Sequence, residues 1–234
     1  MSEKLKLNNF TENQLCELEA PIATASYAPI SHKEIIETVR EELDKKGFAI
    51  NTANYKANHA GTQLIGYYGI KHIDAEIDIM LAFRNSYNKT ISAGVAIGGI
   101  VVICENGMVA GDVSLIRKHT GNASIVVKNK IRAGINKFDI SFKEVLADRD
   151  LMKKQLITKQ ASAEILGRMY IQEKIITNTQ LNIIKNELDY SKHFKTETVW
   201  DFYNHCTESL KTSSAYDWMD NHVNLHNFIK KELI

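Results

Sequence analysis

The residues with the clearest potential for chemistry form a basic stretch near the middle of the chain. No acidic residue occurs between Asp112 and Asp139, although the whole protein is nearly neutral, with 29 lysines and arginines, 28 acidic residues and a net charge of +1. A surface that binds nucleic acid needs cations to neutralise phosphates. The stretch supplies six such cations and one histidine: Arg117, Lys118, His119, Lys128, Lys130, Arg132 and Lys137.

A polar segment upstream could extend this surface. Arg84 and Lys89 enclose Asn85, Ser86, Tyr87 and Asn88 directly after an apolar run, where a loop can present side chains to a ligand. Three aromatic side chains could stack on bases: Tyr67, Tyr68 and Tyr87. Two alternatives stay open here. The polar segment also has the composition of a β-turn, and the basic stretch could be a solvated helix face balanced by acids from elsewhere in the fold.

A second hypothesis is an enzyme. Asn85, Ser86, Cys104 and His119 could meet in a cleft for hydrolysis or group transfer, but the sequence identifies no nucleophile paired with a base. The three cysteines have no metal-ligand spacing, so we expect reduced thiols. His222 and His226 are four residues apart but lack a third ligand, so helix packing is favoured over a metal site. We expect no cofactor and no metal.

The periodicity of apolar residues predicts an α+β fold. Ser31, Glu34 and Gly47 have the spacing of helix start and stop signals, which predicts a helix over 32–46. Alternating and continuous apolar runs then predict an antiparallel sheet, and Asn106-Gly107 predicts a tight hairpin turn. The expected strands lie around residues 50–55, 63–68, 77–83, 91–104 and 108–116.

After residue 120 the pattern predicts only helices. The expected ranges are 122–157, bent near Gly134, and then about 160–173, 178–189, 196–211 and 214–231. We therefore divide the chain into a flexible arm over 1–30, a sheet region over 31–120 and a helical region over 121–234. The helical region is expected either to pack on the sheet or to form an oligomerisation extension.

The first residues contain no apolar segment of signal-peptide length, and no run approaches the roughly 18 apolar residues of a membrane span. The expected location is therefore cytoplasmic, which is the host cytoplasm if the protein is phage-encoded, and no membrane partner is expected.

The polar segment, the glycine-rich strand and the region that follows resemble an uncharacterised family. Asn85, Ser86 and Lys89, then Cys104 and Asn106, then Lys118, His119 and Thr120 match the elements typical of the phage- and plasmid-associated domain-of-unknown-function family numbered 932. The resemblance covers roughly residues 30–135. It implies association with mobile elements, and the order of helix, sheet and helix is similar to that of phage single-strand annealing proteins.

The residues and the resemblance together favour a binding protein for single-stranded DNA, acting as a homo-oligomer in recombination, replication or evasion of host defence. The enzyme is the first alternative. The second is a structural or host-interaction protein that uses the aromatic helices after residue 195 as its contact surface.

Overall fold

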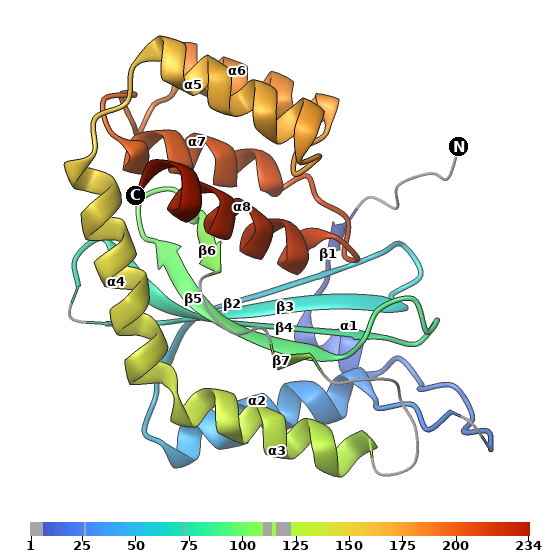
Figure 1. Ribbon diagram of the computed structural model, residues 1–234. Coiled ribbons are helices and arrows are strands. Elements are labelled where there is room, and N and C mark those ends of the chain that lie inside the picture. Colours follow the sequence, from blue (N-terminus) through green and yellow to red (C-terminus); the bar gives the residue numbers. More distant parts are fainter. Residues whose placement is uncertain (1–6, 26, 73, 110–113, 116–122) are drawn as a thin grey trace.

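An antiparallel sheet of seven strands lies at the centre of the protein, with helices on both of its faces (Figure 1). The computed structural model describes residues 7–25, 27–72, 74–109, 114–115 and 123–234. The strands form a meander in the order β1-β2-β3-β4-β5-β6, while β7 pairs with the other end of β5. Their bounds are β1 (Asn8–Asn9), β2 (Ile50–Ala57), β3 (Gln63–Ile70), β4 (Ile77–Ser86), β5 (Gly94–Val101), β6 (Gly107–Val109) and β7 (Ser114–Leu115).

The helices form layers below and above this sheet in the view of Figure 1. Two of them, α2 and α3, lie below it, and α4 runs along one side from the lower layer to the upper. Above the sheet, α7 and α8 lie next to the strands, and α5 and α6 form the outermost layer. Their bounds are α1 (Glu12–Cys16), α2 (His32–Lys45), α3 (Ala123–Asn136), α4 (Phe138–Lys154), α5 (Lys159–Gly167), the π-helical turn η1 (Arg168–Gln172), α6 (Asn178–Tyr190), α7 (Val199–Leu210) and α8 (Trp218–Leu233).

The sheet is buried on both faces, which explains why its strands have continuous apolar runs. On β3, Leu64 belongs to the larger core that α2, α3 and α4 share, whereas the next residue, Ile65, belongs to a second core with Trp218 and Met219 of α8. Successive side chains of a strand point to opposite faces, and β3, β4, β5 and β6 each contribute buried residues to both cores. The mixed fold with a mainly helical second half is therefore as predicted.

Helix α2 confirms the start and stop signals in the sequence. The Ser31 side chain accepts a hydrogen bond from the backbone N–H of Glu34 at 2.9 Å, and Gly47 takes a φ of +74° just after the helix. The predicted long helix over 122–157 is instead two helices, because α3 ends at Asn136 and Lys137 leaves the helical conformation before α4 begins. The break lies three residues beyond the glycine at which a bend was expected.

Two turns differ from the prediction. The hairpin between β5 and β6 exists, but its turn comprises residues 102–105, and Glu105 rather than Asn106 takes a positive φ, of 55°. Asn106 is buried and donates to the backbone oxygen of Asn204 at 3.0 Å, and Gly107 already belongs to β6. Tertiary packing under α7 and α8 therefore outweighs the local turn preference of this pair.

The second difference concerns the polar segment, which was expected to form a ligand-presenting loop or a β-turn after the strand. Strand β4 continues through Arg84 and Asn85 to Ser86, which pairs with Gln63 of β3.

The first thirty residues also contain more order than a flexible arm, since their described part includes β1, a capped helix α1 and the fully buried Leu15 and Ile30.

Candidate nucleic-acid interface

Two cations of the predicted interface form ion pairs between α3 and α2. Arg132 donates from Nε and Nη2 to the two carboxylate oxygens of Glu42, each at 3.0 Å. One turn earlier, Lys128 Nζ lies 3.6 Å from Glu34 Oε1. Residues four apart share one face of a helix, so this face of α3 is turned toward the acids of α2.

Glu42 is the buried member of this set. Its side chain is 8% exposed, and hydrogen bonds from Arg132 and Lys45 lower its pKa to about 2 although burial acts in the opposite direction. A carboxylate that is fully charged at neutral pH therefore sits beside the basic stretch. The balancing acids that the sequence left open come from α2.

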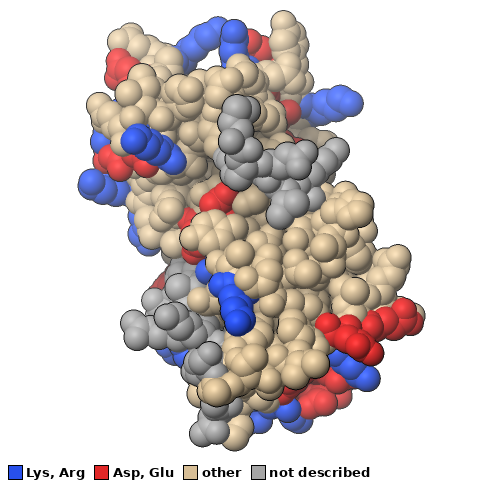
Figure 2. Space-filling view, turned by 90° about the vertical axis from the view of Figure 1, so that its right-hand side faces the viewer, with Lys and Arg blue, Asp and Glu red and all other residues tan. Residues whose placement is uncertain are grey.

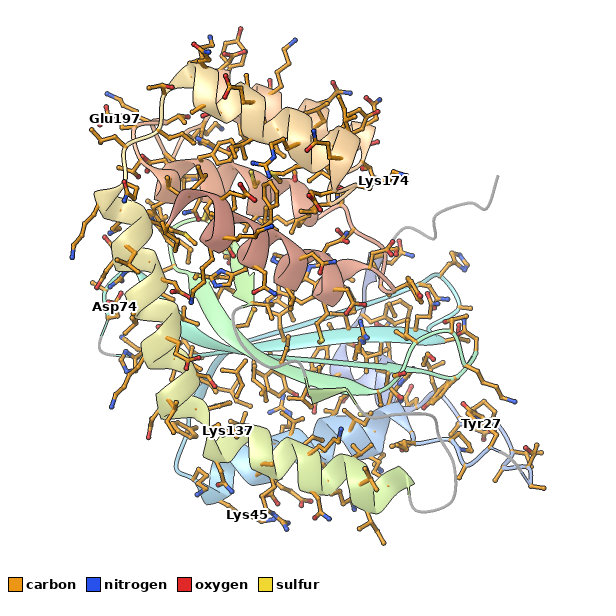
Figure 3. The ribbon with its side chains drawn as sticks, in the orientation of Figure 1. Tyr27, Lys45, Asp74, Lys137, Lys174 and Glu197 are labelled. Carbon is orange, nitrogen blue, oxygen red and sulfur yellow. The ribbon has the colours of Figure 1, made fainter. Side chains whose placement is uncertain are left out.

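The cations nevertheless remain accessible to solvent. The side chains of Lys128 and Arg132 are 50% and 53% exposed, and Lys130 and Lys137 add positive charge on the same stretch. Figure 3 shows Lys45 and Lys137 on the lower helix layer, at the outside of the molecule. The predicted residues Arg117, Lys118 and His119 lie outside the described part of the chain.

The face drawn in Figure 2 does not carry a continuous basic band among its described residues. Basic and acidic groups lie close together at its lower end, at the height of α2 and α3 in Figure 1, and the broad area above them is mostly uncharged.

Arg84 is held inside the fold. It is 5% exposed, and its Nη1 lies 3.1 Å from Asp220 Oδ2 of α8 while Nε donates to the Ser92 backbone oxygen at 3.3 Å. The guanidinium therefore ties the end of β4 to α8, and a phosphate could reach it only by displacing Asp220.

Tyr87 and Asn85 belong to a buried polar cluster around His32. The Tyr87 ring stacks on the His32 ring with centroids 3.9 Å apart, and its hydroxyl accepts from the His32 backbone N–H at 2.7 Å. Asn85 Nδ2 donates to the Ile30 backbone oxygen at 2.9 Å. The cluster fastens the segment before α2 to the end of β4, so Tyr87 is unavailable for stacking on a base in this conformation.

The other two tyrosines are also engaged. Tyr68 is fully buried, with its hydroxyl 2.7 Å from that of Tyr55, and Tyr67 stacks parallel to Trp218 with centroids 6.1 Å apart. Lys89 is exposed in the loop after β4, and its ammonium lies 4.4 Å above the ring of Tyr27, which Figure 3 labels at the lower right. Lys89 and the α3 cations are thus the accessible members of the predicted set within the described chain.

The residues of the enzyme hypothesis are not gathered into one cleft. Asn85 and Ser86 are fully buried at one end of β4, where Ser86 Oγ donates to the Ile91 backbone oxygen at 2.9 Å. Cys104 follows the opposite end of β5, roughly 20 Å away at 3.3 Å per strand residue. Burial also raises the pKa of the Cys104 thiol, so the reactive thiolate is disfavoured. His119 lies outside the described residues.

His222 and His226 pack in the interior, as expected from their spacing on an apolar helix. Burial lowers the pKa of His222 to about 3, and His226 Nε2 lies 3.1 Å from Asp148 Oδ2 of α4. Within the described ranges there is no group of three or more histidine, cysteine or acidic side chains placed to hold a metal ion.

Most of the aromatic residues after position 195 belong to the core. Trp200, Phe202, Tyr203, Trp218 and Phe228 are each at most 7% exposed. Several exposed apolar side chains of the helical half lie around α5 and α6, among them Leu156, Tyr170, Ile171 and Tyr190, and others lie on α3 and α4 and in the turn between α7 and α8. The contact surface assumed for a structural or host-interaction protein is therefore not formed by those aromatic rings.

Sequence reasoning missed the acids that pair with the basic stretch. Glu42 was not singled out, although it lies seven residues after Ile35 on the apolar stripe of α2, a position at which an acid needs a partner. Glu34 was interpreted only as part of the helix start, whereas its carboxylate contacts Lys128 and accepts from Ser124.

The fold and these surfaces define an α+β protein whose antiparallel meander is enclosed by helices on both faces. No helix among the described residues is both long and apolar enough to cross a bilayer. The family described as domain of unknown function, DUF932, matches residues 22–224, and the chain belongs to it. The match extends well beyond residues 30–135, into α8. No curated protein and no solved structure matches the chain.

Proposed function

We propose that this protein binds single-stranded nucleic acid through α3 and the segment that precedes it. The proposal rests on the acid-free stretch between Asp112 and Asp139. Two of its cations, Lys128 and Arg132, have half-exposed side chains on an outer helix. The process served would be recombination, replication or evasion of host defence in a phage or other mobile element, with a homo-oligomer as the working form.

The ion pairs with α2 do not prevent phosphate binding. Lys128 and Glu34 are 3.6 Å apart and partly exposed, and exposed pairs contribute only about 0–1 kcal/mol. A phosphate can replace such a carboxylate at small cost. Arg132 has a bidentate partner in Glu42, so a phosphate would displace that carboxylate with more difficulty.

Exposed apolar groups accompany the cations. Ile125 and Val126, on the first turns of α3, are 60% and 43% exposed. They offer sugars and base faces an apolar contact next to the lysines. Arg84, Tyr68 and Tyr87 are left out of the proposed surface because their polar atoms or rings are already engaged inside the fold.

The test is the salt dependence of binding to a fluorescently labelled oligothymidine, measured by anisotropy. We expect affinity to fall as salt rises. The double variant Lys128→Gln with Arg132→Gln should reduce the slope of log K against log salt by about 0.7 for each phosphate that is no longer neutralised.

The matched control is Lys153→Gln with Arg168→Gln. These two cations also form ion pairs, with Glu76 and Glu232, but lie on other helices. The control removes the same charge, so an equal decrease of affinity in both double variants would show that only net charge matters. Unchanged binding in the α3 variant would exclude α3 as the binding surface.

A further inference from the structure

A small polar cavity lies on the opposite side of the sheet from α3, between the strands and the two C-terminal helices. Its volume is about 140 Å³. Strands β2 to β6 and the β5–β6 turn line it on one side, and α7, α8 and the turn between them line the other. The side chains that matter are Lys56, Tyr67, Thr207, Lys211, Trp218 and His222.

Lys56 is the unusual member of this lining. It projects from β2, is half-buried, and has no acid within ion-pair distance among the described residues. Burial and the neighbouring Lys211 lower the pKa of Lys56, and the carboxylates of Glu105 and Glu208 offset this only in part. Charged groups removed from water are normally paired, but the Lys56 ammonium, which lies between a cavity and a second lysine, has no carboxylate in direct contact within the described chain.

The carboxylates near Lys211 do not form an ion pair with Lys56. The Lys211 ammonium donates to Glu208 Oε2 at 2.6 Å and to the Cys104 backbone oxygen at 2.8 Å, which leaves its third proton available. Glu105 also lines the cavity, but it is exposed to solvent in the β5–β6 turn. Glu208 neutralises the charge of Lys211, and within the described chain no carboxylate contacts the half-buried ammonium of Lys56.

The interior of the cavity offers neutral hydrogen-bonding groups. His222 is 1% exposed, and its Nδ1 has no hydrogen-bond partner within the described structure. The pKa of His222 is lowered to about 3, so the ring is neutral at physiological pH and has one N–H, which the backbone of Gly107 engages. Nδ1 is then a free acceptor. The parallel rings of Tyr67 and Trp218 form an aromatic wall beside it.

We propose that this cavity binds a phosphate-type oxyanion in its monohydrogen form. Lys56 is its ion-pair partner, the third proton of Lys211 is a further donor, and His222 Nδ1 accepts the proton of the phosphate hydroxyl. The size fits a single small group, since the volume is well below the roughly 300 Å³ at which pockets for drug-sized ligands begin. The phosphate is either free inorganic phosphate or the terminal phosphate of a nucleic acid strand.

The experiment titrates the full-length protein with inorganic phosphate at constant ionic strength and follows the thermal unfolding midpoint together with tryptophan fluorescence. A ligand that binds only the folded state raises the midpoint in a saturable way. We expect such saturation, an affinity about tenfold weaker in Lys56→Met, and near-normal affinity in Lys56→Arg, which keeps the charge.

Lys71→Met is the control, because Lys71 is an exposed lysine in the β3–β4 connection with no ion pair in the described structure. It should titrate like the unaltered protein. The Lys128→Gln/Arg132→Gln variant should also leave phosphate binding intact, which separates this site from the α3 surface. A midpoint shift that chloride reproduces at equal ionic strength, or equal phosphate affinity in Lys56→Met and Lys71→Met, would overturn the assignment.

A second arm separates the two sources of phosphate. Dithymidine with and without a 5′-phosphate replaces inorganic phosphate in the titration. Tighter binding of the phosphorylated form than of inorganic phosphate assigns the site to strand ends, and binding of inorganic phosphate alone assigns it to the free ion. No saturable response to any of the three would refute the site altogether.

Discussion

Replacing Glu42 with glutamine tests whether the basic face of α3 is restrained by α2. The pKa of Glu42 lies at about 2 in the folded protein against an ordinary 4.5, and the difference of 2.5 corresponds to about 3.4 kcal/mol as an upper bound. Both cationic partners are about half-exposed, so solvent screening reduces this to about 1–2 kcal/mol. We expect Glu42→Gln to lower the free energy of unfolding at pH 7 by that amount.

The direction of the pH dependence follows from the lowered pKa. A carboxylate with a depressed folded-state pKa stabilises the fold above its unfolded value of 4.5, and this contribution is lost as pH falls toward 2. Urea unfolding should therefore show that the difference in free energy of unfolding between the unaltered protein and Glu42→Gln is less than half as large near pH 3 as at pH 7.

Glu41→Gln is the matched control, because Glu41 is the adjacent residue but its side chain is 68% exposed. It should change stability little at either pH. In the anisotropy assay, Glu42→Gln should also increase the salt slope by about 0.7, since Arg132 becomes available to one more phosphate, whereas Glu41→Gln should not. Equal stabilities for the two variants, or a gap that does not change with pH, would refute the assigned role of Glu42.

Two further predictions concern the contacts that hold the upper layer. A methyl group at Gly98 would lie 1.9 Å from the backbone oxygen of Met108 on β6, so Gly98→Ala should destabilise the protein by about 2–4 kcal/mol in urea unfolding; Gly167→Ala, which meets nothing within 4 Å, should not. Asp148→Asn should speed hydrogen exchange in α8, because Asp148 bonds both His226 and Lys230; unchanged exchange would contradict that link.

The sequence predicted those parts of the fold that depend on neighbouring residues. The α2 boundaries follow from Ser31 and Gly47, and strands β2 to β5 follow from apolar runs that local context is enough to reveal. The single strand expected over 108–116 is instead divided into β6 and β7, which pair with different ends of β5. Asn106-Gly107 failed as a turn because its preference competes with a hydrogen bond to Asn204, about a hundred residues away. Arg84 was likewise expected in a loop or a turn, whereas it is buried in β4, where it pairs with the distant Asp220 and donates to the Ser92 backbone oxygen.

The candidate site shows the same limit. Counting charges along the chain found the basic stretch correctly, but it could not show that Glu34 and Glu42 fold against it from 90 residues upstream. The cavity beside Lys56 was also invisible, because its lining combines several strands and a turn of the sheet with two distant helices. The net charge of a surface depends on residues that folding brings together, and the sequence shows only the charges that are close along the chain.

The position of the sheet makes the two proposed sites independent in experiment. Lys128 and Arg132 lie on the helix layer below it, whereas Lys56 faces the cavity under α7 and α8 above it. Charges separated by a sheet and its two cores interact weakly at physiological salt, where screening acts over about 8 Å. Loss of oligonucleotide binding in the α3 double variant with phosphate binding retained, and the reverse in Lys56→Met, would show two functions. If Lys56→Met also weakens binding of a 5′-phosphorylated strand but not of its unphosphorylated form, one strand must reach both faces, which requires it to pass around the edge of the sheet.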